Sequence, residues 1–155
     1  MATIRVHDKD FTEFLSAIQI QERVSELAAQ INTDYAGKQP LFLAILNGSF
    51  MFASDLFKQI NLEAEISFIK IASYQGMRST GQVVTSIGME QDLHGRDLII
   101  VEDIVDTGKT LSEFLPVLYG YQPKEIIIAT LNVIPDHIEI GLQPVKILRI
   151  IDDIV

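Results

Sequence analysis

The feature that most constrains the fold is a series of short apolar runs that alternate with segments of helical periodicity. The clearest run covers residues 41–46. Further strand candidates cover 65–71, 98–101, 126–131 and 145–151. Such runs are typical of strands that are buried on both faces, as in a parallel sheet covered by helices. The sequence therefore predicts an α/β fold with a doubly wound, mainly parallel sheet and helices on both faces.

Three intervening segments carry one apolar face each. In the first, apolar residues recur at helical spacing from Ile20 to Tyr35, and Gly37 follows. Similar faces cover 50–60 and 111–118. Pro116 lies inside the last of these segments. Because an interior proline costs about 3 kcal/mol, we expect that helix to kink or to start anew there.

Composition narrows the class of protein. The 155 residues show no repeat and no linker, which predicts a single domain over residues 1–155. The absence of cysteine excludes disulfides and zinc–thiolate sites and suits the cytoplasm. We expect no signal peptide and no membrane partner, because charges occur throughout the first twenty residues and no run approaches about 20 apolar residues. The net charge of −9 argues against nucleic acid as a partner.

An acidic pair, Glu102 and Asp103, directly follows the apolar run 98–101. Carboxylate oxygens at the end of a strand suit Mg²⁺ or sugar hydroxyls. A third carboxylate, Asp106, stands in the following loop and is a candidate proton acceptor. Three carboxylates in five positions repel one another. A ligand or cation is therefore a better explanation than a purely structural cap.

The loop continues as Thr107-Gly108-Lys109-Thr110 and leads into the third helical segment. A glycine turn at the start of a helix presents backbone N–H groups to a phosphate, and the hydroxyls and the ammonium group add donors. The loop is not a P-loop, because Asp103 stands where that motif needs its first glycine. No Gly-x-Gly-x-x-Gly follows a strand, which excludes the Rossmann fingerprint.

Residues 72–88 form a polar stretch with three glycines, which is long for a connection in a compact domain. Two interpretations stay open for this stretch. It is either a β-hairpin excursion or a long flexible loop that closes over an active site.

Together these motifs resemble the type I phosphoribosyltransferases. Residues 101–110 resemble the family's motif for 5-phosphoribosyl 1-diphosphate (PRPP), and Glu-Asp-Ile-Val-Asp-Thr-Gly-Lys-Thr is most similar to the hypoxanthine-guanine branch. Residues 46–50 resemble its pyrophosphate loop. Ser73 and Tyr74, followed by 79–81, resemble its flexible catalytic loop. The resemblance runs from about Ile18 to Leu131.

The resemblance implies transfer of the phosphoribosyl group of PRPP to a 6-oxopurine in purine salvage, with Mg²⁺ as cofactor. The base would be hypoxanthine, or also guanine or xanthine. It further implies a homo-oligomer, either a dimer or a tetramer. Two alternatives stay open: a transferase for another base, and a PRPP- or nucleotide-binding regulator with little catalysis.

The resemblance also implies residue roles. Glu102 and Asp103 would hold the ribose hydroxyls, directly or through Mg²⁺. Asp106 would lie near purine N7 as general acid and base, and Ile104 would form part of the floor under the base. The 5′-phosphate would be held by the loop residues Asp106, Thr107, Gly108, Lys109 and Thr110.

Two further loops complete the implied site. Asn47 and Gly48 would meet the pyrophosphate, over which Ser73 and Tyr74 would close as catalytic residues.

The resemblance weakens after Leu131. The family usually places a lysine near Ile134 to recognise the 6-oxo group, and isoleucine donates no hydrogen bond from its side chain. The family also stacks an aromatic ring on the base from its C-terminal hood, but no aromatic residue follows Tyr121 here. We therefore expect a short or altered hood.

Overall fold

The sheet and the helices follow the predicted α/β pattern. The computed structural model describes residues 3–72, 84–87, 91–134 and 145–150. Its main sheet has the order β5-β4-β3-β6-β7-β8. All neighbouring strands in it are parallel except β4 and β5, which are antiparallel. The six strands are β3 (Leu41–Leu46), β4 (Glu65–Ala72), β5 (Val84–Ile87), β6 (Asp97–Val105), β7 (Glu125–Val133) and β8 (Lys146–Arg149).

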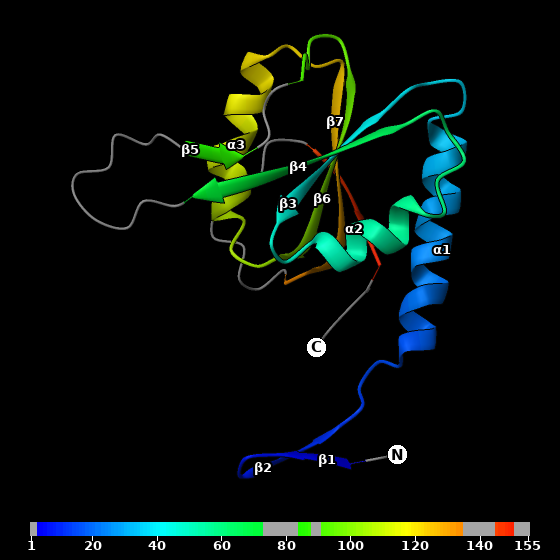
Figure 1. The fold of residues 1–155 in the computed structure, drawn as a ribbon, viewed down its shortest axis with the longest axis vertical. Helices are drawn as coiled ribbons and strands as arrows, with labels where there is room; N and C mark the ends of the chain where they lie inside the picture. The colour runs from blue at the N-terminus through cyan, green and yellow to red at the C-terminus, as the bar shows by residue number, and fades with distance from the viewer. Residues whose placement is uncertain (1–2, 73–83, 88–90, 135–144, 151–155) are drawn as a thin grey trace, which may run out of the picture.

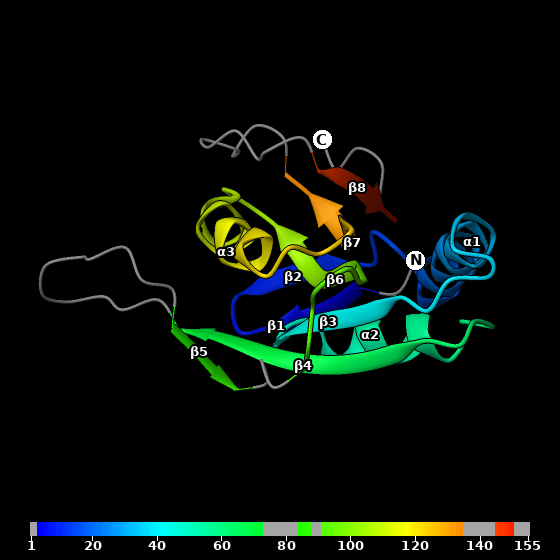
Figure 2. The same ribbon diagram turned by 90° about the horizontal axis from the view of Figure 1, so that it is seen from above.

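Helices cover both faces of this sheet (Figure 2). α1 (Ala17–Asp34) and α2 (Phe50–Phe57) bury their apolar residues against one face. α3 (Lys109–Gly120) packs its apolar face on the other. The prediction of a doubly wound sheet with helices on both faces is thus confirmed.

The order of the strands reverses between β3 and β6. From β3 the chain moves outward to β4 on one side, and from β6 it moves through β7 to β8 on the other. In sheets of this kind, ligands bind beyond the carboxyl ends of the strands at this switch point. At this switch point β3 leads into Asn47 and Gly48, and β6 leads into the loop that begins with Asp106.

Two details differ from the expectations, and a third agrees with one of them. α3 runs without interruption through Pro116, which lies on its exposed side. The helix therefore does not start anew at Pro116, whose ring lies on the side away from the core. β6 extends to Val105, so the acidic pair lies within the strand and not beyond it. β5 pairs with β4 as the hairpin interpretation expected, whereas residues 73–83 lie outside the described residues.

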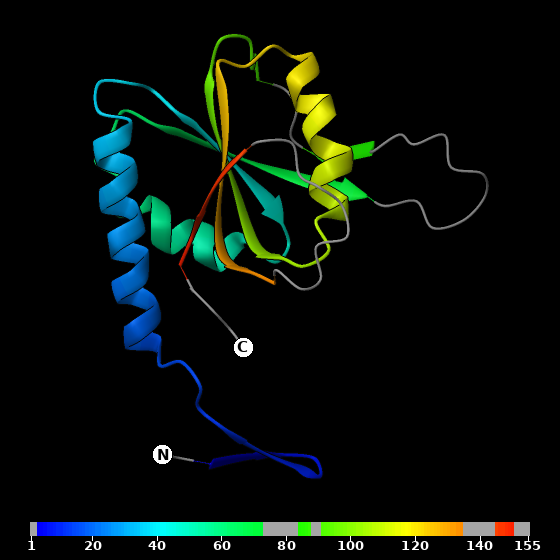
Figure 3. The same ribbon diagram turned by 180° about the vertical axis from the view of Figure 1, so that it is seen from behind.

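A separate two-stranded sheet precedes α1. β1 (Thr3–Val6) and β2 (Lys9–Thr12) pair in antiparallel fashion, and all eight residues are exposed. This hairpin lies apart from the main sheet (Figures 1 and 3). In the part of the chain that the structure describes, no helix is long and apolar enough to cross a membrane.

Candidate active site

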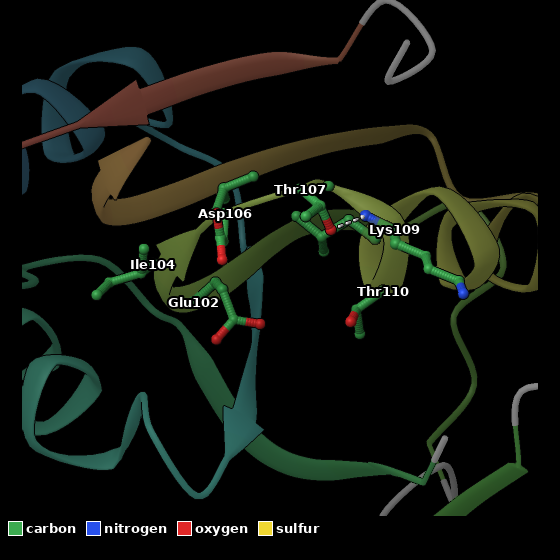
Figure 4. A pocket seen from close by; sticks show the side chains of 9 residues that line it. Glu102, Ile104, Asp106, Thr107, Lys109 and Thr110 are labelled. Carbon is green, nitrogen blue, oxygen red and sulfur yellow. Dashed lines mark hydrogen bonds between the residues drawn. The ribbon is translucent and has the colours of Figure 1, made fainter. Parts of the chain in front are cut away.

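A pocket of about 240 Å³ opens at the carboxyl end of β6. Figure 4 shows the side chains that line it. Two acidic residues, Glu102 and Asp106, contribute to its wall, and the start of α3 closes one side. Its lining consists of Glu102, Ile104, Val105, Asp106, Thr107, Gly108, Lys109, Thr110 and Leu111. The structure therefore brings together seven of the residues that the sequence singled out.

The loop from Asp106 to α3 has the shape of an anion cradle. Gly108 has a φ of 75° and directly precedes the helix, a conformation that glycine adopts without a side-chain clash. The Lys109 N–H donates to the Thr107 hydroxyl at 3.3 Å. The side chain of Lys109 extends away from Glu102 and Asp106 (Figure 4). Backbone N–H groups at a helix start suit a phosphate without adding formal charge.

Glu102 is the most perturbed carboxyl group of this site. Burial, together with the neighbouring carboxyl group of Asp103, raises the pKa of Glu102 to about 8. Its Oε1 accepts a hydrogen bond from the Asp103 N–H at 3.1 Å. The Glu102 carboxyl group therefore resists ionisation, which an incoming cation would favour.

The Asp103 carboxylate lies against Gly48, whereas Glu102 lines the pocket. The Oδ1 of Asp103 accepts from the N–H of Ile104 at 2.8 Å. A Cβ atom placed on Gly48 would overlap the Asp103 carboxylate, with Cγ only 2.6 Å away. The loop after β3 and strand β6 thus meet at the switch point, and a larger residue at position 48 would displace the Asp103 carboxylate.

Two other predicted residues are exposed in the structure, and two lie outside the described residues. Asn47 is exposed beside Gly48, and Ile104 is 48% exposed on the pocket wall. Ser73 and Tyr74 lie outside the described residues. Sequence reasoning missed Thr130, a fully buried residue of β7 whose hydroxyl lies 2.9 Å from the Asp103 carbonyl oxygen. A hydroxyl inside an apolar strand, opposite the acidic pair, was the available signal.

The fold and the site define a class: an α/β domain whose pocket, at the switch point of a parallel sheet, combines carboxyl groups with an exposed helix start that suits a phosphate. Comparison with known proteins then identifies the family. The model of the phosphoribosyl transferase domain matches residues 11–154. The chain belongs to this family.

Individual relatives agree with the family match. The chain is 37% identical over 132 residues to a hypoxanthine phosphoribosyltransferase of Buchnera aphidicola, covering 83% of this chain and 75% of the relative. It is 36% identical over 112 residues to a hypoxanthine-guanine-xanthine phosphoribosyltransferase of Tritrichomonas foetus, covering 72% of this chain and 61% of the relative.

Solved structures give the same result for the fold. A crystal structure of a hypoxanthine-guanine phosphoribosyltransferase from Bacillus anthracis is similar with a TM-score of 0.80 and 33% sequence identity. The similarity covers 90% of this chain and 83% of that one.

Proposed function

We propose that this protein transfers the 5-phosphoribosyl group of PRPP to a 6-oxopurine, such as hypoxanthine, and releases pyrophosphate. The observation that carries the proposal is the single pocket that joins Glu102, Asp106 and the loop 107–110 at the switch point of a phosphoribosyltransferase fold. The names of the relatives support a 6-oxopurine as the base.

In this proposal each part of the pocket has one task. The loop 107–110 binds the 5′-phosphate through backbone N–H groups and hydroxyls. Glu102 and Asp103 hold the ribose hydroxyls, and Asn47 and Gly48 approach the pyrophosphate. Asp106 accepts the proton of purine N7 as N9 bonds to ribose C1, and the bond from C1 to pyrophosphate breaks with its electron pair leaving on pyrophosphate. Ser73 and Tyr74 are proposed to exclude water while this happens.

The residues present fit a magnesium ion. Glu102 and Asp103 supply hard oxygen ligands. The raised pKa of Glu102 marks a carboxyl group that no cation among the described residues compensates. Mg²⁺ is usually held by one or two carboxylates together with substrate oxygens. When bound, the ion would neutralise charge on the pyrophosphate as it leaves.

Replacing Asp106 by asparagine tests the proposed proton transfer. The amide keeps the size of the side chain but accepts no proton. We expect turnover to fall by about 10²–10⁴-fold, the usual contribution of a general acid or base, while PRPP affinity changes little. Pyrophosphate release with a panel of bases measures turnover, and isothermal titration calorimetry measures PRPP binding.

Asp8→Asn, on the exposed turn between β1 and β2, is the matched control and should behave like the wild type. Equal losses of turnover and PRPP affinity in Asp106→Asn would contradict the assigned role. PRPP binding without pyrophosphate release from any base would favour a regulator over an enzyme.

One observation favours a second candidate, a transferase for another base. The family usually has a lysine at this position, which recognises the 6-oxo group of the base, whereas this chain has Ile134. The backbone N–H of Ile134 donates a hydrogen bond to the Val105 carbonyl oxygen at 2.9 Å. The panel of bases separates the two candidates. We also propose a cytoplasmic homo-oligomer, a dimer or a tetramer, which light scattering of the purified protein would test.

A further inference from the structure

Thr130 is a polar residue with no exposed surface in the apolar strand β7. It is in register with Glu102 of β6. Its hydroxyl oxygen lies 2.9 Å from the Asp103 carbonyl oxygen and 3.0 Å from the carbonyl oxygen of Asn132. Because a hydroxyl carries one hydrogen, it donates to one of these two carbonyl groups at a time.

β6 and β7 keep one register here, but one pair of residues is missing from it. The register between β6 and β7 runs through the pair Glu102–Thr130 and resumes at Ile104–Asn132, leaving out Asp103. The N–H groups of Asp103 and Ile104 donate to the acidic side chains of Glu102 and Asp103. The hydroxyl of Thr130 thus provides a bond across the two strands where the regular pairing is interrupted.

The backbone of β6 at Glu102 and Asp103 carries both carboxyl groups, which lie against different neighbours. Glu102 lines the pocket, whereas the Asp103 carboxylate lies against Gly48. The space beside Gly48 is too small for one more carbon atom. A small rotation of the peptide group at Asp103 would therefore disturb its carboxylate.

We propose that Thr130 is a positioning residue, whose hydroxyl holds the Asp103 carbonyl and so fixes the backbone from which the carboxyl groups of Glu102 and Asp103 reach the ribose hydroxyls of PRPP. The ligand in this statement rests on the proposed function. The position of the acidic pair does not, so it is measurable without any ligand.

Three variants test whether the hydroxyl of Thr130, and not the shape of its side chain, is responsible for the proposed role. Thr130→Val keeps the shape and removes the hydroxyl, and Thr130→Ser keeps the hydroxyl. Thr33→Val is the matched control, because the Thr33 hydroxyl donates to a carbonyl oxygen, that of Ala29, at the same 2.9 Å but on α1. Calorimetry measures PRPP affinity in the presence of MgCl₂. Hydrogen exchange followed by mass spectrometry measures protection of peptides that contain residues 102–105.

We expect Thr130→Val to weaken PRPP binding about tenfold, the equivalent of one lost hydrogen bond, and to speed exchange at residues 102–105. Thr130→Ser and Thr33→Val should retain both properties of the wild type. Unchanged exchange and affinity in Thr130→Val would overturn the proposal, as would equal losses in the valine and serine variants. If the wild type binds no PRPP, the proposed function fails, and the exchange data alone decide the role of Thr130.

Discussion

At the scale of single residues, the raised pKa of Glu102 links the stability of the folded protein to the ionisation of the candidate site. Burial and the adjacent Asp103 raise the pKa of Glu102 to about 8. A glutamate in an unfolded chain has a pKa of about 4.3. The folded protein thus holds the proton more tightly than the unfolded chain. The free energy of unfolding should therefore fall as pH rises from about 4.3 to about 8, because the native state resists the loss of that proton.

Glu102→Gln removes this ionisation and should stabilise the metal-free protein at the upper end of that range. We expect melting temperatures of variant and wild type to be similar near pH 4.5 and to diverge toward pH 8, with the variant higher. For a domain of this size, each kcal/mol corresponds to roughly 2–4 °C. Thermal unfolding followed by circular dichroism, in the presence of a chelator, measures the difference.

Glu22→Gln, at an exposed position of α1, is the control and should show no such divergence. A constant difference between Glu102→Gln and the wild type at all pH values would refute the assigned cause.

At the scale of elements, the loop and helix start at 106–110 act as one unit that depends on Gly108. Its φ of 75° places an alanine in a conformation that costs about 1–2 kcal/mol. Gly37 has nearly the same φ, 77°, and a Cβ atom there would meet nothing within 4 Å. Gly108→Ala and Gly37→Ala should therefore lower the melting temperature by similar amounts, and only Gly108→Ala should also weaken PRPP binding. If both variants bind PRPP equally well, this loop does not hold the 5′-phosphate.

Elements were predictable where burial left a periodic pattern. β3 is a continuous apolar run, and its predicted bounds of 41–46 agree with the structure. β6 was predicted too short, because two adjacent carboxyl groups are typical of the end of a strand. Its pairing with β7 nevertheless continues through Glu102 and Ile104 to Val105. The hairpin β1–β2 gave no such pattern, since all of its residues are exposed.

At the scale of the whole molecule, the local part of the site was predictable and its long-range part was not. The run from Glu102 to Thr110 is contiguous in sequence, so its motif was enough to group most of the pocket. The contact between Gly48 and Asp103 depends on the placement of β3 beside β6, which the topology of the sheet decides. Thr130 was missed for the same reason, because threonine is an ordinary strand residue until its partner is known.

The charge of the whole molecule leads to a final prediction. A chain with a net charge of −9 should repel an anion such as PRPP unless a cation accompanies it. We expect PRPP with MgCl₂ to raise the melting temperature, since a ligand at 100 times its Kd adds about 2.7 kcal/mol to the free energy of unfolding. MgCl₂ alone should have little effect, and an excess of EDTA should abolish the increase. Differential scanning fluorimetry measures all three conditions. An equal increase with PRPP in EDTA would show that the loop 107–110 holds the ligand without metal, and would remove Mg²⁺ from the proposed function.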